Sequence, residues 1–177
     1  MRLAIVVGAV LLGGAMVAGR QAPADPKLLS ELKRLFPAAS TFSAKESPPP
    51  HYKAYANDSK LGSRTLIGVA FWTTELEPLE RGYDGPIKIL VGMNLSGVLS
   101  GIIVVDHREP YGSFSVDTPG FSAQFARKNI TDAFKVGADI DAVSRASISI
   151  ASATRAVRNS ARRVARQLLT PPSETGR

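Results

Sequence analysis

The sequence contains no cysteine, which excludes disulfides, thiolate metal sites, iron–sulfur clusters and cysteine nucleophiles. Histidine is nearly as scarce, and a chain with only His51 and His107 is poorly equipped for a histidine-rich metal site. The sequence also lacks a nucleophile elbow and a paired-carboxylate motif, which disfavours a hydrolase. Any redox chemistry therefore requires a bound organic cofactor.

The N-terminal segment has the pattern of an export signal. Arg2 supplies a positive charge, residues 3–19 form an uncharged run of small and apolar residues, and Ala22-Pro23-Ala24 resembles a signal-peptidase site. The run is slightly shorter than the ~20 residues that span a bilayer. We therefore expect residues 1–24 to be a cleaved signal peptide or, as second choice, an uncleaved inner-membrane anchor. Both interpretations make the protein periplasmic or otherwise extracytoplasmic, and the alternative is a buried N-terminal helix.

The formal net charge of +7 is concentrated near the C-terminus. The arginines in this cluster are Arg155, Arg158, Arg162, Arg163 and Arg166. Such a cluster forms either a solvated helix face or a face that docks an acidic partner or anionic lipid head groups. We expect no nucleic-acid partner, because an exported protein seldom meets DNA.

Hydrophobic periodicity predicts a single α+β domain at residues 51–170. Residues 25–50 are expected to be a short helix (27–36, ended by Pro37) and a Pro-rich linker or loop, and 171–177 a tail. Alternating residues predict antiparallel strands at 52–56, 65–73, 87–93 and 98–106. The last two form a hairpin around the turn at 94–97, and we expect them at the centre of a twisted antiparallel sheet.

Helices are predicted to flank the sheet. Residues 121–128 indicate a short helix with Phe121 and Phe125 facing inward, whereas 129–138 is ambiguous. The loops are expected at 75–85 and 107–120. A long C-terminal helix ending before Pro171 follows from apolar residues at helical spacing, namely Val157, Ala161, Val164 and Leu168.

The segment that precedes this long helix is dense in hydroxyl groups. It reads Asp141-Ala142-Val143-Ser144-Arg145-Ala146-Ser147-Ile148-Ser149. A helix N-terminus offers unpaired backbone N–H groups and partial positive charge, which suit a phosphate group. The alternative is simple capping of the helix by Ser144 or Ser147.

This segment resembles the D-x-x-(S/T)-G-A-T signature of the FMN-binding domain family. The family includes the RnfG subunit of Rnf complexes, the C subunit of the sodium-translocating NADH:quinone reductase and the periplasmic N-terminal domain of NosR. Asp141, Ser144, Ala146 and Ser147 match the signature, with Arg145 in place of glycine and Ser147 in place of the final threonine. The resemblance implies that Ser147 carries FMN through a phosphoester bond made by a flavin transferase, with Ser149 as the alternative acceptor.

Two further stretches agree with the family in order and spacing. Residues 82–87 are similar to the G-Y-x-G-x-I entry into the family's hairpin, and residues 107–110 resemble its H-x-E-P loop in the NosR-like form. The resemblance implies that Tyr83, His107 and Glu109 line the flavin ring.

The resemblance therefore implies an exported flavoprotein that acts as an electron carrier rather than a free-standing catalyst. The helix N-terminus and Arg145 would offset the charge of the phosphate. The expected partners are a membrane-bound electron-transfer protein and a flavin transferase. Two alternatives remain, a flavin-free scaffold or sensor domain of the same fold and an exported anion- or lipid-binding module that uses the basic helix.

Overall fold

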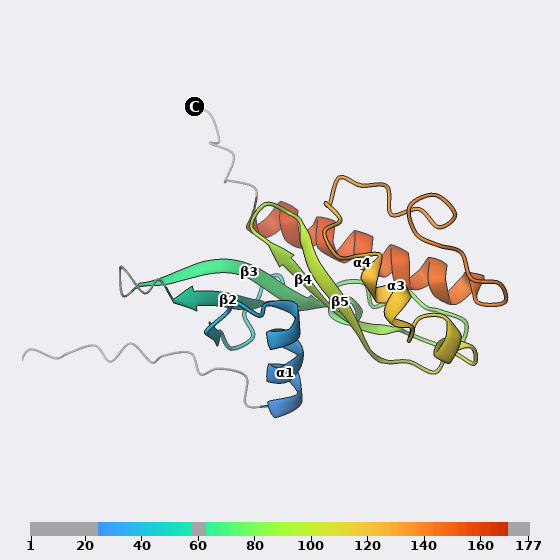
Figure 1. The fold of residues 1–177 in the computed structure, drawn as a ribbon, viewed down its shortest axis with the longest axis horizontal. Helices are drawn as coiled ribbons and strands as arrows, with labels where there is room; N and C mark the ends of the chain where they lie inside the picture. Colours follow the sequence, from blue (N-terminus) through green and yellow to red (C-terminus); the bar gives the residue numbers. More distant parts are fainter. Residues whose placement is uncertain (1–24, 58–62, 170–177) are drawn as a thin grey trace, which may run out of the picture.

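A five-stranded antiparallel meander forms the frame of the domain in the computed structural model, which describes residues 25–57 and 63–169 (Figure 1). The strands lie in sequence order, so each one pairs with its neighbour along the chain. They are β1 Thr41–Phe42, β2 Tyr52–Asn57, β3 Arg64–Trp72, β4 Lys88–Asn94 and β5 Leu99–Asp106. The expected α+β class with an antiparallel sheet is confirmed.

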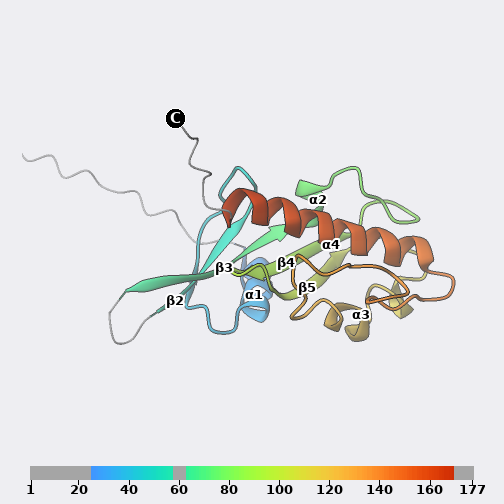
Figure 2. The same cartoon turned by 90° about the horizontal axis from the view of Figure 1, so that it is seen from above.

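Two helices cover opposite faces of the sheet. In Figure 1, α4 (Ser147–Leu168) runs above the sheet and α1 (Pro26–Leu35) lies below it, and Figure 2 shows α4 crossing the sheet lengthwise. The helices predicted at 27–36 and at the C-terminal end are therefore confirmed. The connections also contain α2 Thr73–Leu76, η1 Gly112–Phe114 and α3 Pro119–Ala123.

The alternation of side chains along the strands gives the domain two apolar clusters. On β3, Val69 and Phe71 are buried in the cluster beneath α4, whereas Ala70 and Trp72 belong to the cluster beneath α1. On β4, Leu90 points to the α1 side and its immediate neighbours Ile89 and Val91 point to the α4 side. The sheet is thus buried on both faces, and α4 is fixed against it along most of its length.

The ring of Phe36, just after α1, lies against two glycines of the sheet. A Cβ atom on Gly68 would come within 2.5 Å of the ring atom Cε1 of Phe36 and 2.6 Å of the carbonyl oxygen of Met93. A Cβ atom on Gly92 would come within 3.2 Å of the same ring. These positions therefore require glycine because helix α1 packs so closely on the sheet.

The central position predicted for both arms of the β4–β5 hairpin is wrong for β5, which lies at the edge of the sheet. Residues 127–130 cover the start of this edge, because Arg127 N donates to Leu99 O (2.9 Å) and Leu99 N donates to Lys128 O (2.8 Å). These bonds satisfy backbone groups that an edge strand would otherwise expose. The Pro-rich linker or loop expected between the first helix and residue 50 also contains a strand, the two-residue β1, which pairs with β2.

The helix predicted at 121–128 is wrong in its bounds, since α3 starts at Pro119 and ends at Ala123. Thr118 caps it by accepting a hydrogen bond from Phe121 N (3.1 Å), and Pro119 suits the first turn. Arg127, with a φ of 69°, has a left-handed backbone that no helix continues. The burial predicted for Phe121 and Phe125 is confirmed.

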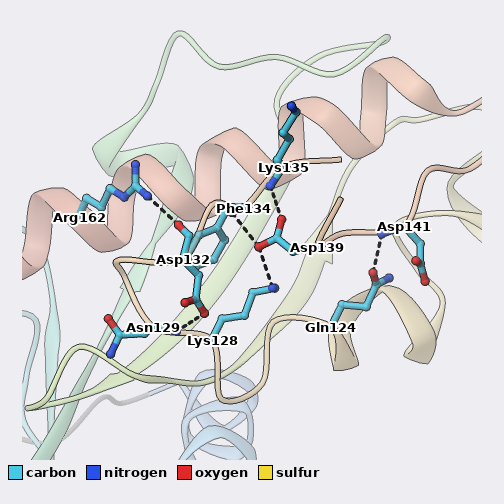
Figure 3. A network of polar contacts seen from close by, with 9 residues as sticks. All are labelled: Gln124, Lys128, Asn129, Asp132, Phe134, Lys135, Asp139, Asp141 and Arg162. Carbon is cyan, nitrogen blue, oxygen red and sulfur yellow. Dashed lines mark hydrogen bonds and ion pairs between the residues drawn. The ribbon is translucent and has the colours of Figure 1, made fainter. Parts of the chain in front are cut away.

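The irregular segment between α3 and α4 is held in place by polar contacts (Figure 3). The carboxylate of Asp139 accepts hydrogen bonds from Lys128 Nζ and Phe134 N, both at 2.9 Å. Arg162, on α4, donates to the carbonyl oxygens of Ile130 and Asp132, both at 2.8 Å. These contacts fix the residues that lead into the hydroxyl-rich segment before α4.

The export segment predicted at residues 1–24 and the tail at 171–177 lie outside the described residues. Within residues 25–57 and 63–169, no helix combines the length and apolar character needed to cross a membrane.

The close packing of Phe36 on Gly68 predicts an effect of mutation on stability. Gly68→Ala forces a methyl group against a buried ring and a backbone carbonyl, and we expect a loss of about 1–3 kcal/mol in the free energy of unfolding. Chemical denaturation monitored by circular dichroism measures it. Gly120→Ala is the matched control, because a Cβ atom there meets nothing within 4 Å, and its stability should not fall. Equal stability of the two variants would contradict the packing argument.

Candidate functional site

The carboxylate of Glu109, which follows β5, joins three segments that are far apart in the sequence. Its Oε2 accepts a hydrogen bond from Tyr83 N (3.0 Å) and its Oε1 accepts one from Asp84 N (3.1 Å). Ser149 Oγ, in the first turn of α4, also donates to Oε2. The side chain is buried, and Gly82 packs directly against it, so that a Cβ atom on Gly82 would overlap the carboxylate. The three motifs identified in the sequence therefore meet at Glu109.

The environment of Glu109 favours its charged form. Burial by itself would raise the pKa of this carboxyl, but the hydrogen bonds from Ser149 Oγ, Tyr83 N and Asp84 N and the nearby His107 oppose it. Together these contacts hold the pKa of Glu109 below its ordinary value. Glu109 is thus an ionised hydrogen-bond acceptor within the protein.

His107 fixes the loop that carries Glu109. Its Nδ1 accepts a hydrogen bond from Glu109 N (2.9 Å), so Nε2 carries the proton in the neutral ring and donates to Asp117 Oδ1 (2.8 Å). The ring packs on Gly112, where a Cβ atom would overlap it. The resemblance implied that His107 and Glu109 line the flavin ring. In the structure neither residue lines the cavity, and both hold the loop that follows β5 in place.

The hydroxyl-rich segment begins α4, as predicted, but its serines do not cap the helix. Ala146 is the N-cap residue and provides no side-chain hydrogen bond, so the capping alternative for Ser144 and Ser147 is wrong. Ser147 is the first residue of α4 and is exposed. The helix N-terminus therefore keeps backbone N–H groups that no side chain caps, which is the arrangement that suits a bound anion.

A cavity of about 490 Å³ opens at this end of α4. It is lined by Tyr83, Pro110, Tyr111 and residues 145–149. Its volume lies within the range of ligand sites, about 300–1,000 Å³. All three motifs thus contribute to one hollow, whereas the hollow of about 590 Å³ between Gly97, Ile130 and Arg166, toward the other end of α4, contains none of them.

The mouth of the cavity carries exposed apolar side chains. Tyr83 is 69% exposed, Ile148 56% and Tyr111 42%. The ring of Phe114, also exposed, lies 5.3 Å from that of Tyr111. Sequence reasoning had identified Tyr83 but missed Pro110, Tyr111 and Ile148, although Pro110 and Tyr111 directly follow Glu109. Such surfaces can stack on a planar aromatic ligand.

The side chains of Ser147 and Arg145 line the cavity without a hydrogen bond or ion pair to any residue that the structure describes. Arg145 has a φ of 67°, the left-handed conformation that glycine adopts without strain. This explains why the signature has glycine at that position. The remaining signature residues lie around them: Ala146 lines the cavity, Ser144 is exposed outside its lining, and Asp141 N donates to Gln124 Oε1 (2.6 Å; Figure 3).

The fold and the site define a class of protein, an α+β domain with a cavity that combines aromatic side chains with an uncapped helix N-terminus. Residues 82–162 match the family model described as FMN-binding domain. The resemblance seen in the sequence is therefore confirmed, and the domain indicates FMN as the cofactor. It supports a flavin-binding, electron-transfer role. No curated protein matches the chain in a sequence comparison.

Ionised Glu109 predicts a pH-dependent contribution to stability. Glu109→Gln replaces one acceptor oxygen by an amide that faces a backbone N–H group, and we expect a loss of about 1–3 kcal/mol near pH 7. Because the folded-state pKa is lowered, this advantage of the native protein is complete above the unfolded-state pKa of about 4.3 and disappears as the pH falls through the folded-state pKa. Urea denaturation of both proteins between about pH 3 and pH 7 measures the difference.

In that comparison the contributions of other carboxylates cancel, because both proteins share them. Glu75→Gln is the control, since its ion pair with Lys45 (2.6 Å) is solvent-exposed and contributes at most about 1 kcal/mol. A difference in the free energy of unfolding between native protein and Glu109→Gln that stays constant down to pH 3 would contradict the lowered pKa of Glu109.

The left-handed backbone of Arg145 gives a second prediction. Arg145→Gly removes the steric strain, partly offset by the greater freedom of glycine in the unfolded chain, and should raise the free energy of unfolding by up to about 1 kcal/mol. Arg127→Gly, with a φ of 69° in the native residue, should do the same. Thermal denaturation of both variants measures the gain in stability. A melting temperature below that of the native protein for either variant would contradict backbone strain at that position.

Proposed function

We propose that the protein is an exported flavoprotein that holds FMN covalently at Ser147 and relays electrons to or from a membrane-bound redox partner. The observation that carries this proposal is the position of Ser147. Its hydroxyl is exposed at the start of α4, in the cavity that the family motifs surround, and no described residue binds it. The match of residues 82–162 to the FMN-binding domain supports the cofactor.

The residues of the cavity fit FMN in both chemical character and arrangement. When bound, FMN supplies one- or two-electron transfer through its isoalloxazine ring. Tyr83, Tyr111 and Ile148 offer apolar and aromatic surface for a planar ring. The uncapped N-terminus of α4 offers N–H groups and partial positive charge for a phosphate.

Among the serines of the motif, Ser147 fits an ester best. Ser149 is buried and donates its hydroxyl to Glu109, and Ser144 lies outside the lining of the cavity. In the proposed attachment, Ser147 Oγ loses its proton and bonds to the flavin's phosphorus, and the group that the donor flavin carried on that phosphorus leaves. A flavin transferase would catalyse this step. Serine in place of threonine keeps the required hydroxyl.

Export remains part of the proposal and rests on residues 1–24, which have the sequence pattern of a signal peptide or anchor. A covalent bond suits an extracytoplasmic carrier, because flavin that dissociates outside the cytoplasm is not easily recovered. The protein would then work in the periplasm, free or attached to the inner membrane.

We propose that the membrane-bound partner docks at the mouth of the cavity rather than on the arginine face of α4. Exposed Tyr83, Tyr111, Phe114 and Ile148 surround or adjoin this opening. The arginines of α4 are largely engaged within the chain: Arg155 pairs with Glu80 (2.7 Å) and Arg163 with Glu77 (3.2 Å). Short distance from a cofactor to its partner favours electron transfer through such a mouth.

Covalent attachment is tested by in-gel flavin fluorescence of the denatured full-length protein after co-expression with a flavin transferase. We expect a fluorescent band for the native protein and none for Ser147→Ala, because the ester oxygen is removed. Ser147→Thr, which restores the signature residue, should be at least as fluorescent as the native protein.

Ser144→Ala is the matched control, since it removes a neighbouring exposed hydroxyl, and it should stay fluorescent. Fluorescence that survives in Ser147→Ala but is lost in Ser149→Ala would move the attachment to Ser149. A dark native band would overturn the covalent proposal and favour loosely held flavin or a flavin-free scaffold.

A further inference from the structure

Arg145 has a strained backbone conformation and a charged side chain that pairs with no described residue. Its left-handed conformation (φ 67°) would be adopted more easily by glycine, the residue of the family signature at this position. The side chain nevertheless lines the cavity, two residues before Ser147. No described residue forms a hydrogen bond or ion pair with its guanidinium group, in contrast to Arg155, which pairs with Glu80.

The position of Arg145 decides which part of a ligand it can reach. Arg145 lines the cavity together with Ser147, the first residue of the uncapped N-terminus of α4, which suits a phosphate group. A guanidinium group binds phosphate through two parallel hydrogen bonds, which are stronger and more directional than those of an ammonium group. The isoalloxazine ring, by contrast, would contact the aromatic and apolar surface of Tyr83, Tyr111 and Ile148.

We propose that Arg145 is the residue of this chain that binds the flavin phosphate, and that it selects FMN over unphosphorylated riboflavin. This inference rests on the proposed function. The positive charge supplied by Arg145 compensates the dianionic phosphate monoester, and the signature glycine could not do so. Arginine in place of glycine thus adds backbone strain but also adds a group that binds the phosphate.

The test uses the full chain produced without a flavin transferase, so that only reversible binding is measured. FMN and riboflavin are titrated separately with the protein, and quenching of flavin fluorescence gives each dissociation constant. We expect the native protein to bind FMN at least about tenfold more tightly than riboflavin. Arg145→Gly should weaken FMN binding by about the same factor and leave riboflavin binding unchanged. Arg145→Lys should fall between them.

Arg127→Gly is the matched control. Arg127 is also an exposed arginine with a left-handed backbone (φ 69°), but it lies beside the start of β5 and outside the lining of the cavity. Arg127→Gly should therefore change neither dissociation constant. Because both glycine variants relieve backbone strain, weaker FMN binding by Arg145→Gly alone would reflect the lost guanidinium group and not a loss of folding.

Two outcomes separate this inference from the proposed function. If native protein binds FMN and Arg145→Gly binds it equally well, the role of Arg145 is overturned while the flavin-binding function stands. If native protein binds neither flavin reversibly, the role of Arg145 is overturned, whereas covalent attachment is decided separately by the in-gel fluorescence of the protein co-expressed with a flavin transferase. An equal loss of FMN affinity in Arg127→Gly would also overturn the role of Arg145, since the effect would then arise from the backbone.

Discussion

The buried carboxylate of Glu109 is the contact on which the cavity depends. It receives hydrogen bonds from the loop at residues 82–85 and from Ser149 of α4, while His107 accepts a hydrogen bond from its backbone N–H. A buried carboxylate is costly unless its oxygens are fully used, and here three donors use them. The energetic requirement to satisfy one charge therefore brings three motifs together and builds the walls of the cavity.

Helix α4 extends this constraint across the domain. Ser149 in its first turn is tied to Glu109, and Arg155 in its middle pairs with Glu80. Arg162 further along the helix donates to the carbonyl oxygens of Ile130 and Asp132. The apolar face of α4 packs along the sheet at the same time. A helix held at several points keeps Ser147 in a defined position, as the proposed attachment of a cofactor to this residue requires.

Local pattern was sufficient for the elements whose burial follows from their own periodicity. The helix at 27–36, the strands from 52 to 94 and the long C-terminal helix were predicted because each has a clear apolar face or alternation. The edge position of β5 and the early end of α3 were not, because they depend on residues 127–130, which pair with β5. Long-range pairing leaves no periodic signal in either partner.

The sequence by itself determined two things: without cysteine any redox chemistry needs an organic cofactor, and the resemblance of the motifs around Tyr83, Glu109 and Ser147 to the FMN-binding domain family implied FMN. Only the tertiary structure distinguished the roles of similar residues. The hydroxyl of Ser149 donates a hydrogen bond to Glu109, 40 residues away in the sequence, whereas Ser147 lines the cavity without such a partner among the described residues. Hydrogen-bond partners and backbone angles such as that of Arg145 are set by the packing of distant segments, which motif spacing does not encode.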